Sequence, residues 1–144
     1  MDAESQKSLQ WLGDQHFEEQ RSLRAAEDNL FNWAMSLFLA GFGALTGLRG
    51  ITTAQWSAQW RLLIMLGLVV IVAVILLMAF LIRFNYERNQ AALARIMAQL
   101  RQTGGAANIP EGPSFIVDRL FFYLRWSAVG AMGLILLVLV WMLG

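Results

Sequence analysis

The stretch LLIMLGLVVIVAVILLMAFLI, residues 62–82, decides the fold of this chain. Its 21 residues carry no charged side chain, and about 20 apolar residues are enough to cross the hydrocarbon core of a bilayer. Two further uncharged runs lie on either side of it, residues 29–48 and residues 126–144. The sequence therefore predicts an all-α membrane protein with three transmembrane helices.

The composition excludes an ordinary soluble protein. Of the 144 residues, 58% are hydrophobic and 15% are charged, compared with roughly 45–50% and about 25% in soluble domains. The chain has no cysteine, which excludes disulfides, thiolate metal sites and cysteine nucleophiles. It also lacks metalloprotease, P-loop and dinucleotide-binding motifs, and its one histidine is His16. We therefore expect neither an enzyme, nor a cofactor, nor a metal site.

The distribution of charge predicts the topology. Residues 1–29 hold three basic and seven acidic residues, whereas residues 83–125 hold six arginines and three acidic residues. Three spans place both segments on one side of the membrane and leave only Arg49 and Arg61 on the other. The positive-inside rule then places the N-terminus in the cytoplasm and the C-terminus on the other side of the membrane. The charged residues 1–28 do not resemble a cleavable signal peptide.

The segments outside the spans are expected to be mostly helical. Residues 1–28 form a cytoplasmic amphipathic head helix, and its acidic polar face suits a protein partner better than an anionic lipid surface. Residues 49–61 form an outer loop with a short helix capped by Thr53 and anchored by Trp56 and Trp60. Residues 83–125 contain a basic helical extension of the second span, a linker rich in Gly and Pro at 104–114, and a lead-in to the third span. The expected apolar face of the head helix contains Leu9, Leu12, His16, Leu23 and Ala26.

Residues Tyr86, Leu93 and Leu100 recur every seven positions in the extension, with Ile96 between them and Asn89 as an interruption. This pattern favours packing against the head helix, and a homo-oligomeric helical stalk is the alternative.

The first span carries a line of small or polar residues at helical spacing, here called the small-residue stripe. One interpretation is close packing between helices, in which Gly43 and Gly47 form a GxxxG pair. The other is a water-accessible surface that lines a pore, which requires several subunits around an axis. Its members are Asn29, Asn32, Ser36, Ala40, Gly43 and Gly47. Gly130, Ala131 and Gly133 predict a second close-packing face, in the third span. Phe121, Phe122, Tyr123 and Trp126 are expected at the inner interface of that span, and Trp141 at the outer one.

Five arginines of the basic segment, here called the arginine set, could bind lipid headgroups, the acidic head, or an anionic ligand such as a nucleotide or oligonucleotide. They are Arg88, Arg95, Arg101, Arg119 and Arg125. Four acidic residues of the head could pair with them at rest and act as a gate, namely Glu18, Glu19, Glu27 and Asp28. As an alternative, these carboxylates belong to solvated helix faces.

Residues 25–36 resemble the YidH-like family of small three-span bacterial inner-membrane proteins. Ala25, Glu27 and Trp33 match the family pattern, whereas Asp28, Asn29 and Met35 stand where the family has Arg, Thr and Arg. In its short length, its few spans, its cytoplasmic helices and its lack of enzyme motifs, the chain is also similar to small membrane effectors of anti-phage systems. The resemblance implies a bacterial inner membrane, with the C-terminus in the periplasm. We expect a homo-oligomeric pore that assembles through the small faces of the first and third spans and is gated from the cytoplasm. The alternative is a non-conducting scaffold subunit that recruits a cytoplasmic partner.

Overall fold

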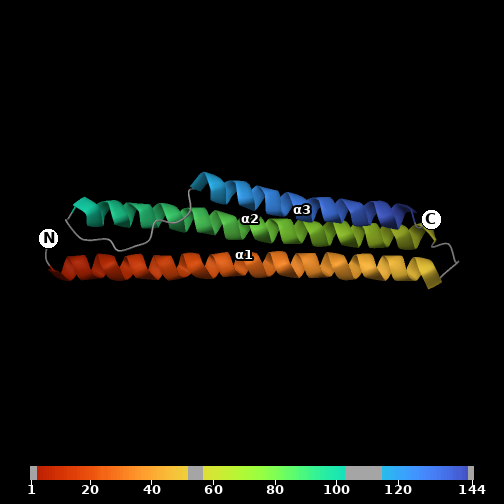
Figure 1. Cartoon of the computed structure of the whole chain (residues 1–144), viewed down its shortest axis with the longest axis horizontal. Helices are drawn as coiled ribbons and strands as arrows, with labels where there is room; N and C mark the ends of the chain where they lie inside the picture. The colour runs from red at the N-terminus through yellow and green to blue at the C-terminus, as the bar shows by residue number, and fades with distance from the viewer. Residues whose placement is uncertain (1–2, 52–56, 103–114, 143–144) are drawn as a thin grey trace. The chain divides into compact units, whose positions relative to one another are not determined.

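The computed structural model describes residues 3–51, 57–102 and 115–142, which form three helices (Figure 1). They are α1 (Ala3–Ile51), α2 (Ala58–Gln102) and α3 (Phe115–Met142). Each helix contains a segment long and apolar enough to cross a membrane. In its described residues the chain is therefore all-helical, with three helices able to span a membrane, as its three uncharged runs predict.

The helices are longer than the predicted spans. α1 has 49 residues and α2 has 45, because neither sequence contains a proline that would remove a backbone donor. α2 begins after Ser57, whose hydroxyl accepts a hydrogen bond from the amide of Trp60 at 3.5 Å. Trp60 thus lies in the first turn of α2, while the short outer helix expected around Thr53 and Trp56 falls outside the described residues.

The chain divides into two compact units, which are described separately. The apolar unit contains residues 29–79 and 115–144, and the polar unit contains residues 1–28 and 80–114. α1 and α2 contribute to both units, whereas α3 belongs to the apolar unit alone.

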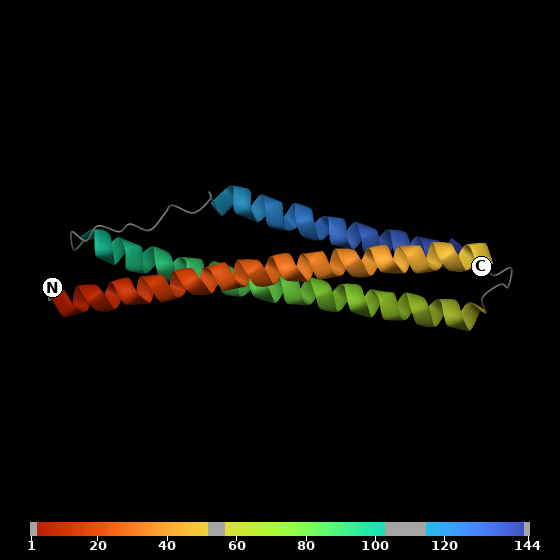
Figure 2. The same cartoon turned by 60° about the horizontal axis from the view of Figure 1, so that its bottom comes forward.

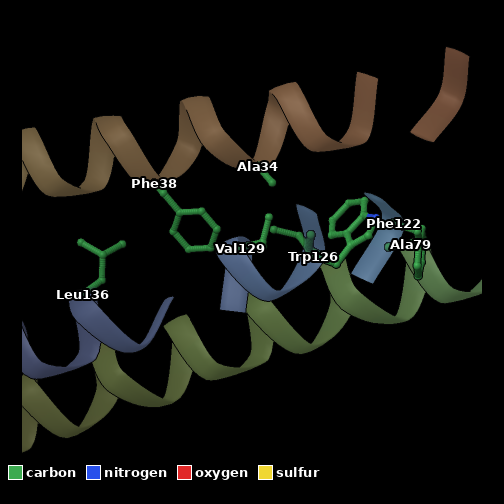
Figure 3. Close-up of a cluster of buried hydrophobic side chains, with 8 residues drawn as sticks. Ala34, Phe38, Ala79, Phe122, Trp126, Val129 and Leu136 are labelled. Carbon is green, nitrogen blue, oxygen red and sulfur yellow. The ribbon is translucent and has the colours of Figure 1, made fainter. Parts of the chain in front are cut away.

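The apolar unit is a three-helix arrangement with a continuous hydrophobic core. The Phe31 and Trp126 rings have centroids 6.0 Å apart, and a Cβ on Gly41 would lie 3.7 Å from Leu136. Both pairs differ by 95 positions, so α1 and α3 run parallel, and α2 runs antiparallel to them (Figures 1 and 2). Figure 3 shows part of this core, which consists of Ala34, Phe38, Ile75, Ala79, Phe122, Trp126, Val129 and Leu136.

The contacts of α3 correct one expectation. Phe122 and Trp126 are buried in the core instead of facing the membrane interface, whereas Phe121, Tyr123 and Trp141 are exposed. Of the predicted close-packing face, only Gly133 meets a neighbouring helix, since a Cβ there would lie 2.8 Å from Cγ2 of Val72. Gly130 has open space in place of a Cβ contact, and Ala131 is exposed.

In the polar unit, α1 and α2 pack in antiparallel directions (Figure 2). His16 bonds to Asn89, and Arg24 bonds to Tyr86. The expected contact between the head and the extension of the second span is therefore present within this unit.

The buried face of α1 in the polar unit differs from the expected one. Leu12 and Ala26 are exposed, whereas Gly13 and Glu27 are buried and Gln20 is half-buried. The residues that face α2 recur at alternating steps of four and three, the heptad spacing of helices that pack along their length. On α1 they are Leu9, Gly13, His16, Gln20, Leu23 and Glu27, and on α2 they are Ile82, Tyr86, Asn89, Leu93, Ile96 and Leu100.

Candidate functional site

The whole small-residue stripe lies on the exposed side of α1. Asn29, Asn32, Ser36, Ala40, Gly43 and Gly47 are all exposed. The buried residues of the same helix segment, Ala34 and Phe38, are two residues from Asn32, Ser36 and Ala40 and therefore point to the opposite side. Packing against α2 and α3 thus uses the bulky face of α1 and leaves the stripe uncovered by the described chain.

The C-terminal half of the stripe has no large side chain, since its members are Ala40, Gly43 and Gly47. Nothing lies within 4 Å of a Cβ placed on Gly43 or Gly47. Small residues at four-residue spacing let a second helix approach the backbone closely. The GxxxG pair is therefore available to a helix from another molecule.

The polar side chains of the stripe differ in how they are satisfied. The Ser36 hydroxyl donates to the carbonyl of Asn32 at 2.8 Å, within its own helix. The Asn32 side-chain amide, by contrast, makes no hydrogen bond with any described residue. The side-chain amide of Asn29 makes none either. Because an unpaired amide in hydrocarbon costs free energy, these two asparagines are the members of the stripe that most need water or a partner helix.

The four acidic residues proposed as a gating head lie in two environments. Glu18, Glu19 and Asp28 are exposed. Glu27 is 9% exposed and occupies a heptad position of the α1–α2 contact. The description of Glu27 as part of a solvated face is therefore wrong, because the helix turns this carboxylate toward α2.

Tyr86 is the centre of a buried polar cluster in the polar unit. Its ring is approached by the guanidinium groups of Arg24, at 5.7 Å, and Arg83, at 5.2 Å. Arg24 also donates a hydrogen bond to the Tyr86 hydroxyl at 3.2 Å. Arg83 is itself buried, and its Nε lies 3.3 Å from a carboxylate oxygen of Glu87. Two arginines are thus held by one aromatic ring, and neither was predicted to have this role.

A second polar contact joins His16 and Asn89. Nδ1 of His16 donates to the side-chain oxygen of Asn89, and the Asn89 amide donates to the His16 carbonyl at 3.0 Å. An amide oxygen only accepts hydrogen bonds, so Nδ1 carries the proton in this pair. Asn89, which interrupts the apolar heptad, is therefore a buried contact that fixes which residues of α1 and α2 lie opposite each other.

We expect Asn89→Ala to destabilise the polar unit by about 1–3 kcal/mol, because it removes both hydrogen bonds between Asn89 and His16 and leaves Nδ1 only the carboxylate of Glu19, at 3.5 Å. Hydrogen–deuterium exchange of the amides of α2 in this unit should rise. Asn85→Ala, at an exposed position four residues earlier, is the matched control. Equal exchange in the two variants would contradict the role of Asn89.

The arginine set is split between the two units. Arg88, Arg95 and Arg101 are exposed on α2 in the polar unit, and Arg119 and Arg125 lie on α3 in the apolar unit. The Arg125 guanidinium lies 4.5 Å from the centroid of the Phe31 ring, a cation–π contact that ties α3 to α1. Arg125 therefore has a structural contact, which separates it from the exposed arginines of α2.

Sequence reasoning missed Tyr86, Arg83 and the His16–Asn89 pair as polar contacts. The signal that could have found them is heptad position, since His16 and Asn89 both fall where an apolar residue is usual. Among the described residues, no group of three His, Cys, Asp or Glu side chains could hold a metal ion. No protein-family model, curated protein or solved structure matches the chain.

Proposed function

We propose that the protein is a homo-oligomeric pore of the bacterial inner membrane, with its N-terminus in the cytoplasm. The observation that carries this proposal is the exposure of the entire small-residue stripe, on the side of α1 opposite to the core. A single helix cannot enclose a channel, so the α1 helices of several copies would surround the pore axis. Asn32 and Ser36 would then supply its polar lining near the cytoplasmic end.

The polar unit is the proposed gate. It contains the acidic part of α1, as the head helix, and the basic extension of α2. A signal that rearranges this unit, such as an anionic ligand bound at exposed arginines, would open the pore. Opening would dissipate ion gradients across the inner membrane, which is how small membrane effectors of anti-phage systems are expected to act.

We expect Asn32→Leu and Ser36→Leu to reduce ion flux through protein reconstituted in liposomes at least tenfold, because leucine would close a narrow polar lining. Ala44→Leu is the matched control, since Ala44 is exposed on α1 and lies off the stripe. Equal flux in all three variants and the wild-type chain would contradict a pore lined by the stripe.

A gate that is closed at rest would give low flux in every sample, so a second measurement is required. The chain has no cysteine, which allows Asn32→Cys, Ser36→Cys and Ala44→Cys to be labelled individually with a charged, membrane-impermeant thiol reagent. A water-lined stripe predicts fast labelling at positions 32 and 36 and slow labelling at 44. Slow labelling at all three positions would contradict a water-filled pore.

The second candidate function is a non-conducting scaffold subunit. It is favoured by the hydrogen bonds of Ser36 and Thr46, whose hydroxyls donate to carbonyls one turn back, each at 2.8 Å. Hydroxyls satisfied in this way are compatible with a dry interface between helices. A scaffold predicts stable oligomers in which positions 32 and 36 are protected from the reagent.

A further inference from the structure

We propose that the polar units of neighbouring copies bind each other, with the acidic pair Asp14 and Glu18 on the outer face of α1 from one copy against the basic outer row of α2 from the next. The central pair is Glu18 of one copy and Arg88 of its neighbour. This inference rests on the self-association proposed above. It identifies the surface of a second copy that would bind Arg88 and Arg95, two exposed arginines of α2.

The outer face of α2 in the polar unit has the composition of a helix-docking surface. Its exposed residues recur at steps of four and three, on the side opposite to Tyr86, Leu93 and Leu100. Along this row arginine alternates with alanine, and alanine allows a second helix to approach closely while the arginines reach past it. The row consists of Phe84, Arg88, Ala91, Arg95, Ala98 and Gln102.

The outer face of α1 has the complementary charge. Asp14 and Glu18 are exposed on α1, on the side opposite to His16 and Gln20. Residues 3–28 hold six acidic and three basic residues, whereas residues 80–102 hold four arginines and one glutamate. The exposed bases Lys7 and Arg21 lie seven residues from Asp14, on the same side of α1, so the acidic part of this outer face is limited to Asp14 and Glu18. The charged residues of the outer row of α2, by contrast, are both arginines, Arg88 and Arg95.

Within the described part of one copy, the charged side chains of these two faces are not paired with each other. Asp14, Glu18, Arg88 and Arg95 make no ion pair with any described residue. The hydrogen bonds between the two helices instead join His16 to Asn89 and Arg24 to Tyr86. A second copy can therefore bind both rows without displacing a contact of the first.

Glu18 and Arg88 also lie at nearly the same level along the helix axes. The contact between His16 and Asn89 places them at one level of the antiparallel pair. Glu18 is two residues from His16, and Arg88 is adjacent to Asn89, so both lie within about 3 Å of that level along the helix axes. Copies inserted in one orientation and related by rotation about the membrane normal keep equal heights. Glu18 of one copy therefore meets Arg88 of the next without a vertical shift.

The first test is reversal of charge, read by native mass spectrometry of the detergent-solubilised full chain. We expect Arg88→Glu alone and Glu18→Arg alone each to lower the fraction of oligomer at least threefold, and the double variant Glu18→Arg with Arg88→Glu to restore it. Restoration is a result that simple misfolding of the single variants does not produce. A wild-type oligomer fraction in Arg88→Glu, or no recovery in the double variant, would overturn the proposal.

The second test is disulfide trapping in membranes, which the absence of native cysteine makes specific. Differently tagged chains carrying Glu18→Cys and Arg88→Cys, when co-expressed and oxidised, are expected to give a mixed dimer. Glu18→Cys with Ala98→Cys is the control, because Ala98 lies in the same row but about 15 Å further along the helix. No mixed dimer, or an equal yield from the control pair, would overturn the proposal.

The outcomes separate this inference from the proposed pore. Mixed dimers without ion flux and without labelling of the stripe would support the inference and overturn the pore. Flux and labelling without mixed dimers would support the pore and overturn the inference. Binding of inorganic polyphosphate to the wild-type chain, together with an unchanged oligomer fraction for Arg88→Glu, would also overturn the inference.

Discussion

The Gly133→Leu variant is expected to melt in detergent at a clearly lower temperature than the wild-type chain. The physical reason is the distance of 2.8 Å between a Cβ placed on Gly133 and Cγ2 of Val72, which is shorter than real Cβ contacts. Overpacking of a formed core costs about 1–3 kcal/mol, and leucine adds three carbon atoms beyond that Cβ. α2 and α3 must therefore separate, or Val72 must move, to accommodate the variant.

Gly67→Leu is the matched control for this prediction. Gly67 lies on α2, is exposed, and has nothing within 4 Å of a Cβ. Its replacement keeps the gain in helix propensity that any Gly→Leu change brings, about 1 kcal/mol. A rescuing variant, Gly133→Ala with Val72→Ala, should melt above Gly133→Ala alone. Equal melting of Gly133→Leu and Gly67→Leu would show that the α2–α3 contact does not limit stability.

Gly133 also illustrates how far the sequence could predict the apolar unit. The number of spans follows directly from three uncharged runs, because length and hydropathy are properties of each helix alone. Which face of a span is buried does not follow, because lipid and protein core are equally apolar and no polar face marks the outside. For this reason Phe122 and Trp126 were expected at the membrane interface, although they are buried in the core.

The polar unit was more predictable on α2 than on α1. Tyr86, Leu93 and Leu100 are apolar or aromatic at seven-residue spacing, and the structure places all three in the contact with α1. On α1, the corresponding positions include Gly13 and Glu27, which pattern analysis assigns to loops and surfaces. A polar residue in a heptad position shows its role only when the residue opposite to it is known. The stripe was found from spacing alone, yet its exposure depends on how three helices pack.

Replacing Tyr86 with alanine is expected to have the largest effect in the polar unit. Tyr86 is 6% exposed, and loss of a buried aromatic side chain typically costs about 3–5 kcal/mol. The variant also removes the surface on which Arg24 and Arg83 lie and the acceptor of the Arg24 hydrogen bond. Since Arg83 is itself buried, its guanidinium would then border a cavity. We expect amide exchange throughout the α1–α2 contact of this unit to increase, to an extent that exceeds the effect of Asn89→Ala.

Two further variants separate the contributions of Tyr86. Tyr86→Phe keeps the ring for both arginines and removes only the hydroxyl, so it should cost about 1 kcal/mol. Tyr123→Ala removes a tyrosine that is 65% exposed on α3 and should leave exchange in the polar unit unchanged. If Tyr86→Phe were as damaging as Tyr86→Ala, the hydrogen bond from Arg24 and not the stacking of two arginines would hold the cluster. If neither variant raised exchange, the buried charge of Arg83 would have to be stabilised by groups other than the ring, among them Glu87, whose carboxylate lies 3.3 Å from Nε of Arg83.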